Sequence, residues 1–157
     1  MDDRAYFGLS IVVSFCAWIL VAVLYVWPRV DSAPVSVALM ALMAPHMFRF
    51  IGLSFLVPGV VREPLDPRFA RPAAYGDVLA AVLAMAGTLA LSWGVSWAIA
   101  LVWIFNLWGS ADLIHAMIQG GVRLEKSGML GATFYIPTLV VPGLLVSHAL
   151  IFLLLLA

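Results

Sequence analysis

The sequence has little charge and almost no cysteine. Only 10% of its 157 residues are Asp, Glu, Lys or Arg, whereas a soluble domain carries about a quarter. The net charge is zero and no basic run occurs, so we expect no nucleic-acid partner. The single cysteine, Cys16, excludes an intrachain disulfide and any cluster of cysteine ligands. No zinc-protease, P-loop or dinucleotide-binding signature is present, so a non-enzymatic protein is favoured.

What the sequence has in excess is apolar residues, which make up 65% of the chain. Several apolar runs exceed the roughly 18 to 20 residues needed to cross a hydrocarbon core. The pattern predicts an all-α integral membrane bundle that forms one transmembrane domain over residues 1–157. Five spans are expected, at about 6–27, 34–60, 74–93, 96–119 and 130–156. The first is expected to be a retained span that ends at Pro28, and residues 62–76, rich in proline and charge, to be the main loop.

The basic residues are distributed unequally between the two sides that this topology defines. One side holds Arg4, Arg62, Arg68, Arg71, Arg123 and Lys126, and the other holds Arg29. Cytoplasmic loops carry the excess of Lys and Arg, so we predict a cytoplasmic N-terminus and an external C-terminus. A bacterial inner membrane is the expected location. The expected partners are the lipid bilayer and either other membrane subunits or further copies of the chain.

Two charged residues lie deep inside the predicted spans. At 1.5 Å per residue, Arg49 in the second span lies about 22 Å below the outer end, and Asp112 in the fourth about 24 Å. Asp112 is the only acidic residue that we place well inside a span. A charge at this depth needs a partner, so we predict an Arg49–Asp112 ion pair. Changing either residue alone to leucine should then be more damaging than changing both.

Further polar residues are predicted to flank this pair. The same spacing places His46 and Asn106 at about 18 and 15 Å, and it places His115 on the same helix face as Asp112. Thr138 in the fifth span completes the candidate cluster. Prolines in the second and fifth spans free backbone carbonyl groups, which could line a polar cavity.

Three functions fit these residues. The first is the binding of a small or amphiphilic ligand at the polar cluster, or a role as a subunit of a membrane complex. The second is a b-type haem or quinone site with His46 and His148 as the axial pair, although their depths differ by about one helical turn. The third is a proton- or ion-coupled transporter in which Arg49, Asp112 and His115 form a relay. No cofactor is required by the sequence.

Overall fold

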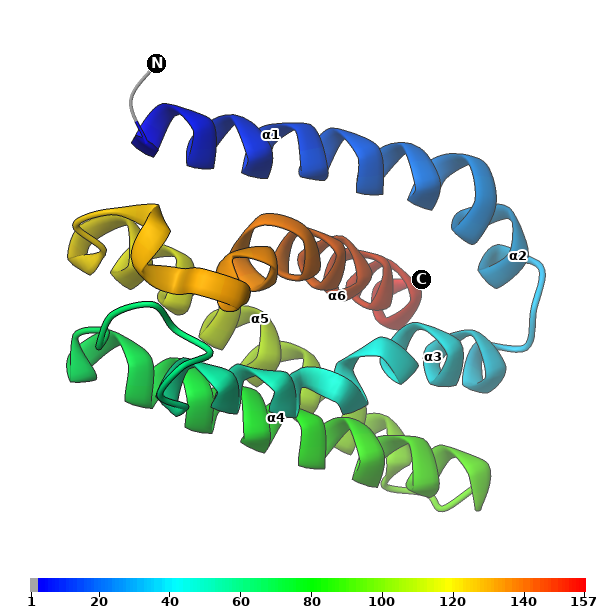
Figure 1. Cartoon of the computed structure of the whole chain (residues 1–157). Helices are drawn as coiled ribbons and strands as arrows, with labels where there is room; N and C mark the ends of the chain where they lie inside the picture. The colour runs from blue at the N-terminus through cyan, green and yellow to red at the C-terminus, as the bar shows by residue number, and fades with distance from the viewer. Residues whose placement is uncertain (1–2) are drawn as a thin grey trace.

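The computed structural model describes residues 3–157, and this part of the chain consists of helices and loops without a β-sheet (Figure 1). Five helical segments are long and apolar enough to cross a membrane, which confirms the predicted number. They are Asp3–Asp31, Val35–Leu56, Pro67–Ser92, Ala98–Arg123 and Ile136–Leu156. The predicted boundaries need correction at the first, third and last segments.

The first segment does not end at Pro28. It runs from α1 (Asp3–Val21) through a π-helical turn, η1 (Ala22–Val26), into α2 (Trp27–Asp31). Proline at the first positions of a helix requires no amide hydrogen, and the π turn before it absorbs the geometric mismatch. The prediction treated proline as a stop, whereas here it lies at the junction of two helices.

The second segment changes its helix type at a proline. α3 (Val35–Met43) is α-helical, and η2 (Ala44–Leu56) is a 3-10 helix with Pro45 among its first residues. A 3-10 run of this length is uncommon, because its hydrogen bonds are less well aligned than those of an α-helix. It repeats every three residues, and the buried residues of η2 follow that repeat: His46, Arg49, Gly52 and Phe55. One straight line of side chains therefore faces the interior.

The third segment begins earlier than predicted. α4 (Pro67–Ser92) starts inside the stretch that was expected to be a loop, with Pro67 at its first position and Pro72 within its second turn. The Asp66 side chain caps the helix by accepting a hydrogen bond from the Arg68 backbone N–H. Hydrogen bonds from the Arg68 side chain and backbone hold the pKa of Asp66 below its usual range. Proline near a helix start costs little, so the loop prediction over 67–76 was wrong.

The turn between the third and fourth segments lies where the sequence predicts it. α4 ends at Ser92 and α5 (Ala98–Arg123) follows after a short turn that contains Gly94 at φ +65°. The chain then passes through η3 (Ser127–Phe134), a 3-10 segment, and η4 (Ile136–Val140), a π-helical one, into α6 (Val141–Leu156). The backbone of Gly131 in η3 is non-helical, so the last apolar segment begins at Ile136 and not at residue 130 as predicted.

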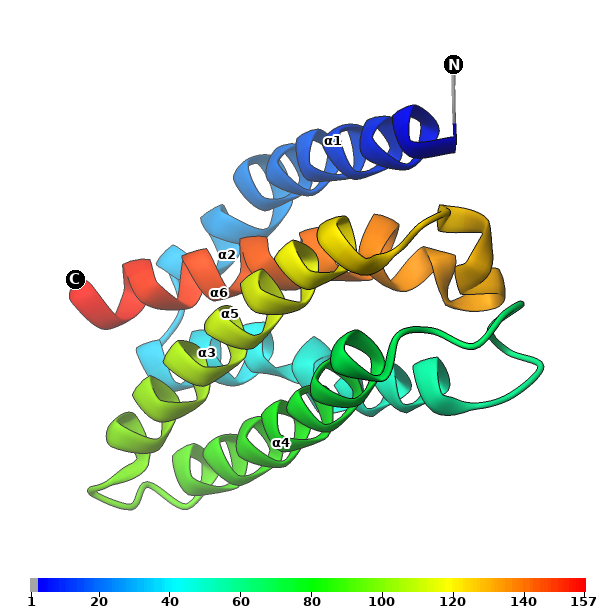
Figure 2. The same ribbon diagram turned by 90° about the vertical axis from the view of Figure 1, so that its left-hand side faces the viewer.

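Helix packing is uneven across the bundle. α1 lies along the outside and contacts the α6 side, as Figures 1 and 2 both show. α4 is the most buried of the five spans, and it packs against η2 and α5. Small residues of α4 are buried against these neighbours: Ala80, Ala81, Ala84, Gly87 and Ala90.

The interior has three layers along the helix axes. One apolar cluster includes Leu39, Ala84 and Val102, and another includes Phe69, Leu113 and Leu144. Along the helices, a set of buried polar residues lies between the residues of the first cluster and those of the second. This set is His46, Arg49, Asp77, Asn106 and His148. A polar layer therefore separates two apolar layers.

Candidate functional site

Arg49 is the centre of the polar layer. Its side chain is 1% exposed, and it forms ion pairs with two carboxylates from two different helices. Arg49 Nε donates to Asp77 Oδ1 of α4 at 2.7 Å, and Nη2 donates to Asp112 Oδ2 of α5 at 2.6 Å. Nη1 donates to the Gly109 carbonyl oxygen at 3.1 Å. The guanidinium thus joins η2, α4 and α5 through hydrogen bonds from a charged donor, which are stronger than bonds between neutral groups.

The Arg49–Asp112 pair was predicted from helix depth and is confirmed, whereas Asp77 was missed. The predicted third span began at residue 74, which put Asp77 at its edge. Because α4 begins at Pro67, Asp77 lies about 15 Å along the helix. Asp66 followed by Pro67 is a recognisable helix start, and it was the signal that could have corrected the boundary.

Three glycines make room for this network. A Cβ atom added at Gly52 would overlap the Asp77 carboxylate, and one added at Gly76 would overlap the carboxylate of Asp112. At Gly109 it would lie 2.9 Å from Arg49 Nη1. Each carboxylate therefore lies directly against the backbone of a neighbouring helix, an approach that any larger residue would prevent.

His148 of α6 adjoins the network as a neutral ring. The Asn106 amide nitrogen donates to the His148 carbonyl oxygen at 3.2 Å, which orients Asn106 Oδ1 toward His148 Nδ1 at 2.6 Å. Nδ1 therefore carries the hydrogen, and Nε2 is the acceptor that faces Arg49 Nη1 at 3.5 Å. This tautomer is neutral, so His148 adds no charge to the cluster.

His46 differs from His148 in having no polar contact. It is fully buried, and neither ring nitrogen has a hydrogen-bond partner among residues 3–157. Its ring packs against Phe105 and His148, with centroid distances of 5.1 and 4.2 Å. Asn106, predicted beside His46, hydrogen-bonds His148 instead.

The haem alternative does not fit this arrangement. Two axial imidazoles must lie on opposite sides of a porphyrin plane with the iron between them. The rings of His46 and His148 are instead in direct contact, and His148 Nδ1 is bonded to Asn106. The predicted axial pair is therefore wrong for this packing.

Two other predicted residues lie away from the buried network. His115 is exposed on α5, one turn from Asp112. Thr138 is buried, but its hydroxyl donates to the carbonyl oxygen of Phe134, four residues earlier at the end of η3. The structure thus joins Arg49, Asp112, Asn106 and His148 directly or through one contact, and leaves His115 and Thr138 outside.

Two backbone carbonyl groups near the prolines accept hydrogen bonds from side chains of other helices. Trp18 Nε1 donates to the Leu139 carbonyl oxygen at 2.9 Å, and Ser147 Oγ donates to that of Leu42 at 2.8 Å. These two backbone groups are therefore satisfied within the bundle and need no water.

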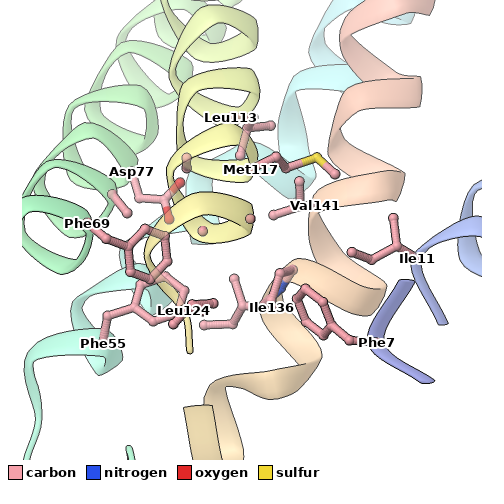
Figure 3. Close-up of a pocket in the computed structure, with 15 residues that line it drawn as sticks. Phe7, Ile11, Phe55, Phe69, Asp77, Leu113, Met117, Leu124, Ile136 and Val141 are labelled. Carbon is pink, nitrogen blue, oxygen red and sulfur yellow. The ribbon is translucent and has the colours of Figure 1, made fainter. Parts of the chain in front are cut away.

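An apolar cavity of about 50 Å³ lies beside the network on the Asp77 side (Figure 3). Figure 3 shows side chains converging on it from α1, η2, α4, α5 and the start of the last segment, with the Asp77 carboxylate at its edge. Asp77 is the only charged or polar side chain among the described residues that line the cavity. The others are Phe7, Ile11, Phe55, Phe69, Ala73, Leu113, Ala116, Met117, Gly120, Gly121, Leu124, Ile136, Pro137 and Val141.

An open groove of about 480 Å³ reaches the network at Asp112, the second carboxylate that pairs with Arg49. It runs between α4 and α5, and its lining includes Tyr75, Trp108 and His115. The two carboxylates bound by Arg49 thus face different spaces, since Asp77 lines the cavity and Asp112 lines the groove.

Comparison with known families gives one match. The family model described as Domain of unknown function (DUF8737) covers residues 6–156, almost the whole chain. The chain belongs to the DUF8737 family. No curated protein and no solved structure matches it.

Proposed function

We propose that the protein is a multi-pass membrane protein of a bacterial inner membrane, with its N-terminus in the cytoplasm and its C-terminus outside. Ser127 donates hydrogen bonds to Asp3, and Arg123 forms an ion pair with Asp66. The start of α1, the start of α4 and the end of α5, near which most basic residues lie, are therefore at the same end of the bundle. That end is expected to be cytoplasmic. A C-terminal alkaline phosphatase fusion should be active and a C-terminal green fluorescent protein fusion dark; the reverse result contradicts the orientation.

We further propose that the bundle binds a small amphiphilic ligand in the cavity beside Asp77. The observation that carries this proposal is the single carboxylate at the edge of an otherwise apolar cavity. An apolar cavity in a protein stays dry and favours an apolar occupant. A short alkyl chain matches the lining, and a hydroxyl or ammonium group matches the acceptor oxygens of Asp77.

Three compounds with the same chain test the polar end of the site. Hexylamine, hexanol and hexanoate are each added to the protein in lipid nanodiscs, and the thermal transition is measured. Hexylamine and hexanol should raise the transition temperature, because a ligand that binds only the folded state stabilises it. Hexanoate should not, because its carboxylate would face the negative charge of Asp77.

Two glycines supply a matched pair of variants. Gly121 lines the cavity, and a Cβ atom added there meets no atom within 4 Å, so Gly121→Leu introduces a bulky side chain beside the cavity without a clash. Gly128 is equally open but does not line the cavity. Gly121→Leu should abolish the response to hexylamine, and Gly128→Leu should retain it. Equal responses to all three compounds, or a full response in Gly121→Leu, would contradict the proposed site.

A further inference from the structure

The polar layer contains more negative than positive charge. One guanidinium, that of Arg49, pairs with two carboxylates, those of Asp77 and Asp112. His148 donates from Nδ1 to Asn106, and its Nε2 faces the Arg49 guanidinium as an acceptor, so the ring is neutral. His46 is buried without a polar partner, which is unfavourable for a charged ring. With both carboxylates ionised, the layer would therefore hold one uncompensated negative charge.

An uncompensated charge is costly at this position. Apolar clusters lie on both sides of the layer, and the side chains of Asp77 and Asp112 are only 10% and 11% exposed. Removing an ion from water without full compensation costs several kcal/mol, and such a group usually becomes neutral by binding a proton. No further cationic side chain contacts either carboxylate among residues 3–157.

We infer that the Asp77–Arg49–Asp112 cluster is a proton-binding site, in which the two carboxylates share one exchangeable proton at neutral pH. The proton restores neutrality, since the cluster then has one positive and one negative charge. The geometry allows sharing because Arg49 bonds both carboxylates and can stabilise whichever one is ionised. This inference goes beyond the ligand proposal and does not depend on it.

The groove provides the route for proton exchange. Asp112 lines the groove, and exposed His115 lines it one helical turn away. The titratable and charged groups around the proton are thus Arg49 from η2, Asp77 from α4, His115 from α5 itself and His148 from α6, with His46 beyond His148.

Infrared spectroscopy of the full chain in nanodiscs tests the inference. Wild type at neutral pH should show the carbonyl stretching band of a protonated carboxylic acid, and the band should shift in heavy water. Asp77→Asn and Asp112→Asn have nearly the same shape as the native residues, and each leaves one carboxylate for one guanidinium. The band should therefore disappear in both single variants. Asp31→Asn, at the exposed end of α2, should leave it unchanged.

Each outcome decides the question. A band that persists in one of the two Asn variants would mean that one carboxylate is protonated independently of the other, and would overturn sharing. The absence of the band in wild type would overturn proton binding, whatever else neutralises the cluster. Loss of the wild-type band at high pH provides a measurement that needs no variant. The hexylamine response is measured separately, so failure of one proposal does not imply failure of the other.

Discussion

α1 and α4 are both long apolar helices, but only one of them is packed by the protein. About 11% of the most apolar window of the first span is buried, against 50% for α4. α1 presents large side chains such as Leu9, Val13 and Leu20 outward. α4 buries alanines and glycines, and with them the carboxylate of Asp77. α1 is therefore suited to contact lipid, whereas α4 is suited to contact other helices, as small residues at helix interfaces are.

The largest expected change in stability comes from removing the positive charge of Arg49, which pairs with Asp77 of α4. Arg49→Met should lower the free energy of unfolding by about 3 to 5 kcal/mol, the cost of breaking a buried ion pair. The matched change in the first span, Arg29→Met, should have little effect, because that residue is exposed and donates to the Tyr25 carbonyl oxygen of its own helix. Unfolding in detergent mixtures measures both.

Compensation should require three changes and not two. With Asp77 as a second partner, Arg49→Met with Asp112→Asn still leaves one carboxylate without a cation. We expect this double variant to recover part of the stability and the triple variant, with Asp77→Asn added, to recover more. If the double variant is as stable as wild type, Asp77 contributes nothing to the pairing. The main difference drawn between α4 and α1, that α4 supplies a buried charge partner, would then be wrong.

The next effect is the change in stability when a glycine is replaced by alanine, which should have opposite signs in α4 and α1. Gly76→Ala should destabilise the protein by about 1 to 3 kcal/mol, because its Cβ atom would overlap the Asp112 carboxylate. Gly8→Ala in α1 meets nothing within 4 Å. It should be neutral or stabilising by up to about 1 kcal/mol, the difference in helix propensity. Thermal unfolding of the two variants against wild type gives both signs; stabilisation by Gly76→Ala would show that the close contact is not real.

The smallest effect concerns the hydrogen bond between α1 and the last segment. Trp18→Phe removes the bond from Nε1 to the Leu139 carbonyl oxygen and keeps most of the ring. Such bonds between membrane helices average about 0.6 kcal/mol, so a loss of that order is expected. Trp93→Phe, in the exposed turn after α4, serves as the control. A loss from Trp18→Phe as large as that from Arg49→Met would mean that α1 is as integral to the fold as α4.

Span number and the need for a charge partner could be predicted because both follow from local rules. Run length sets the number of crossings, and the insertion cost of Arg49 requires a carboxylate at similar depth. The prolines were harder to interpret. Pro28 and Pro67 lie at the starts of helices, where proline is tolerated, and Pro72 lies inside α4, whereas prolines were expected to interrupt the helices. One misplaced boundary then concealed Asp77.

By itself, the sequence determined the helical class, the five apolar segments and the pairing of Arg49 with Asp112. Only the tertiary structure decided that the guanidinium serves two carboxylates, that His148 is a neutral neighbour and that His46 has no polar contact. Depth along a helix can be counted from residue numbers, since the rise per residue is constant. Which side chains share one interior point depends on helix rotation and on how closely glycines let the backbones approach, and these are properties of the packed bundle.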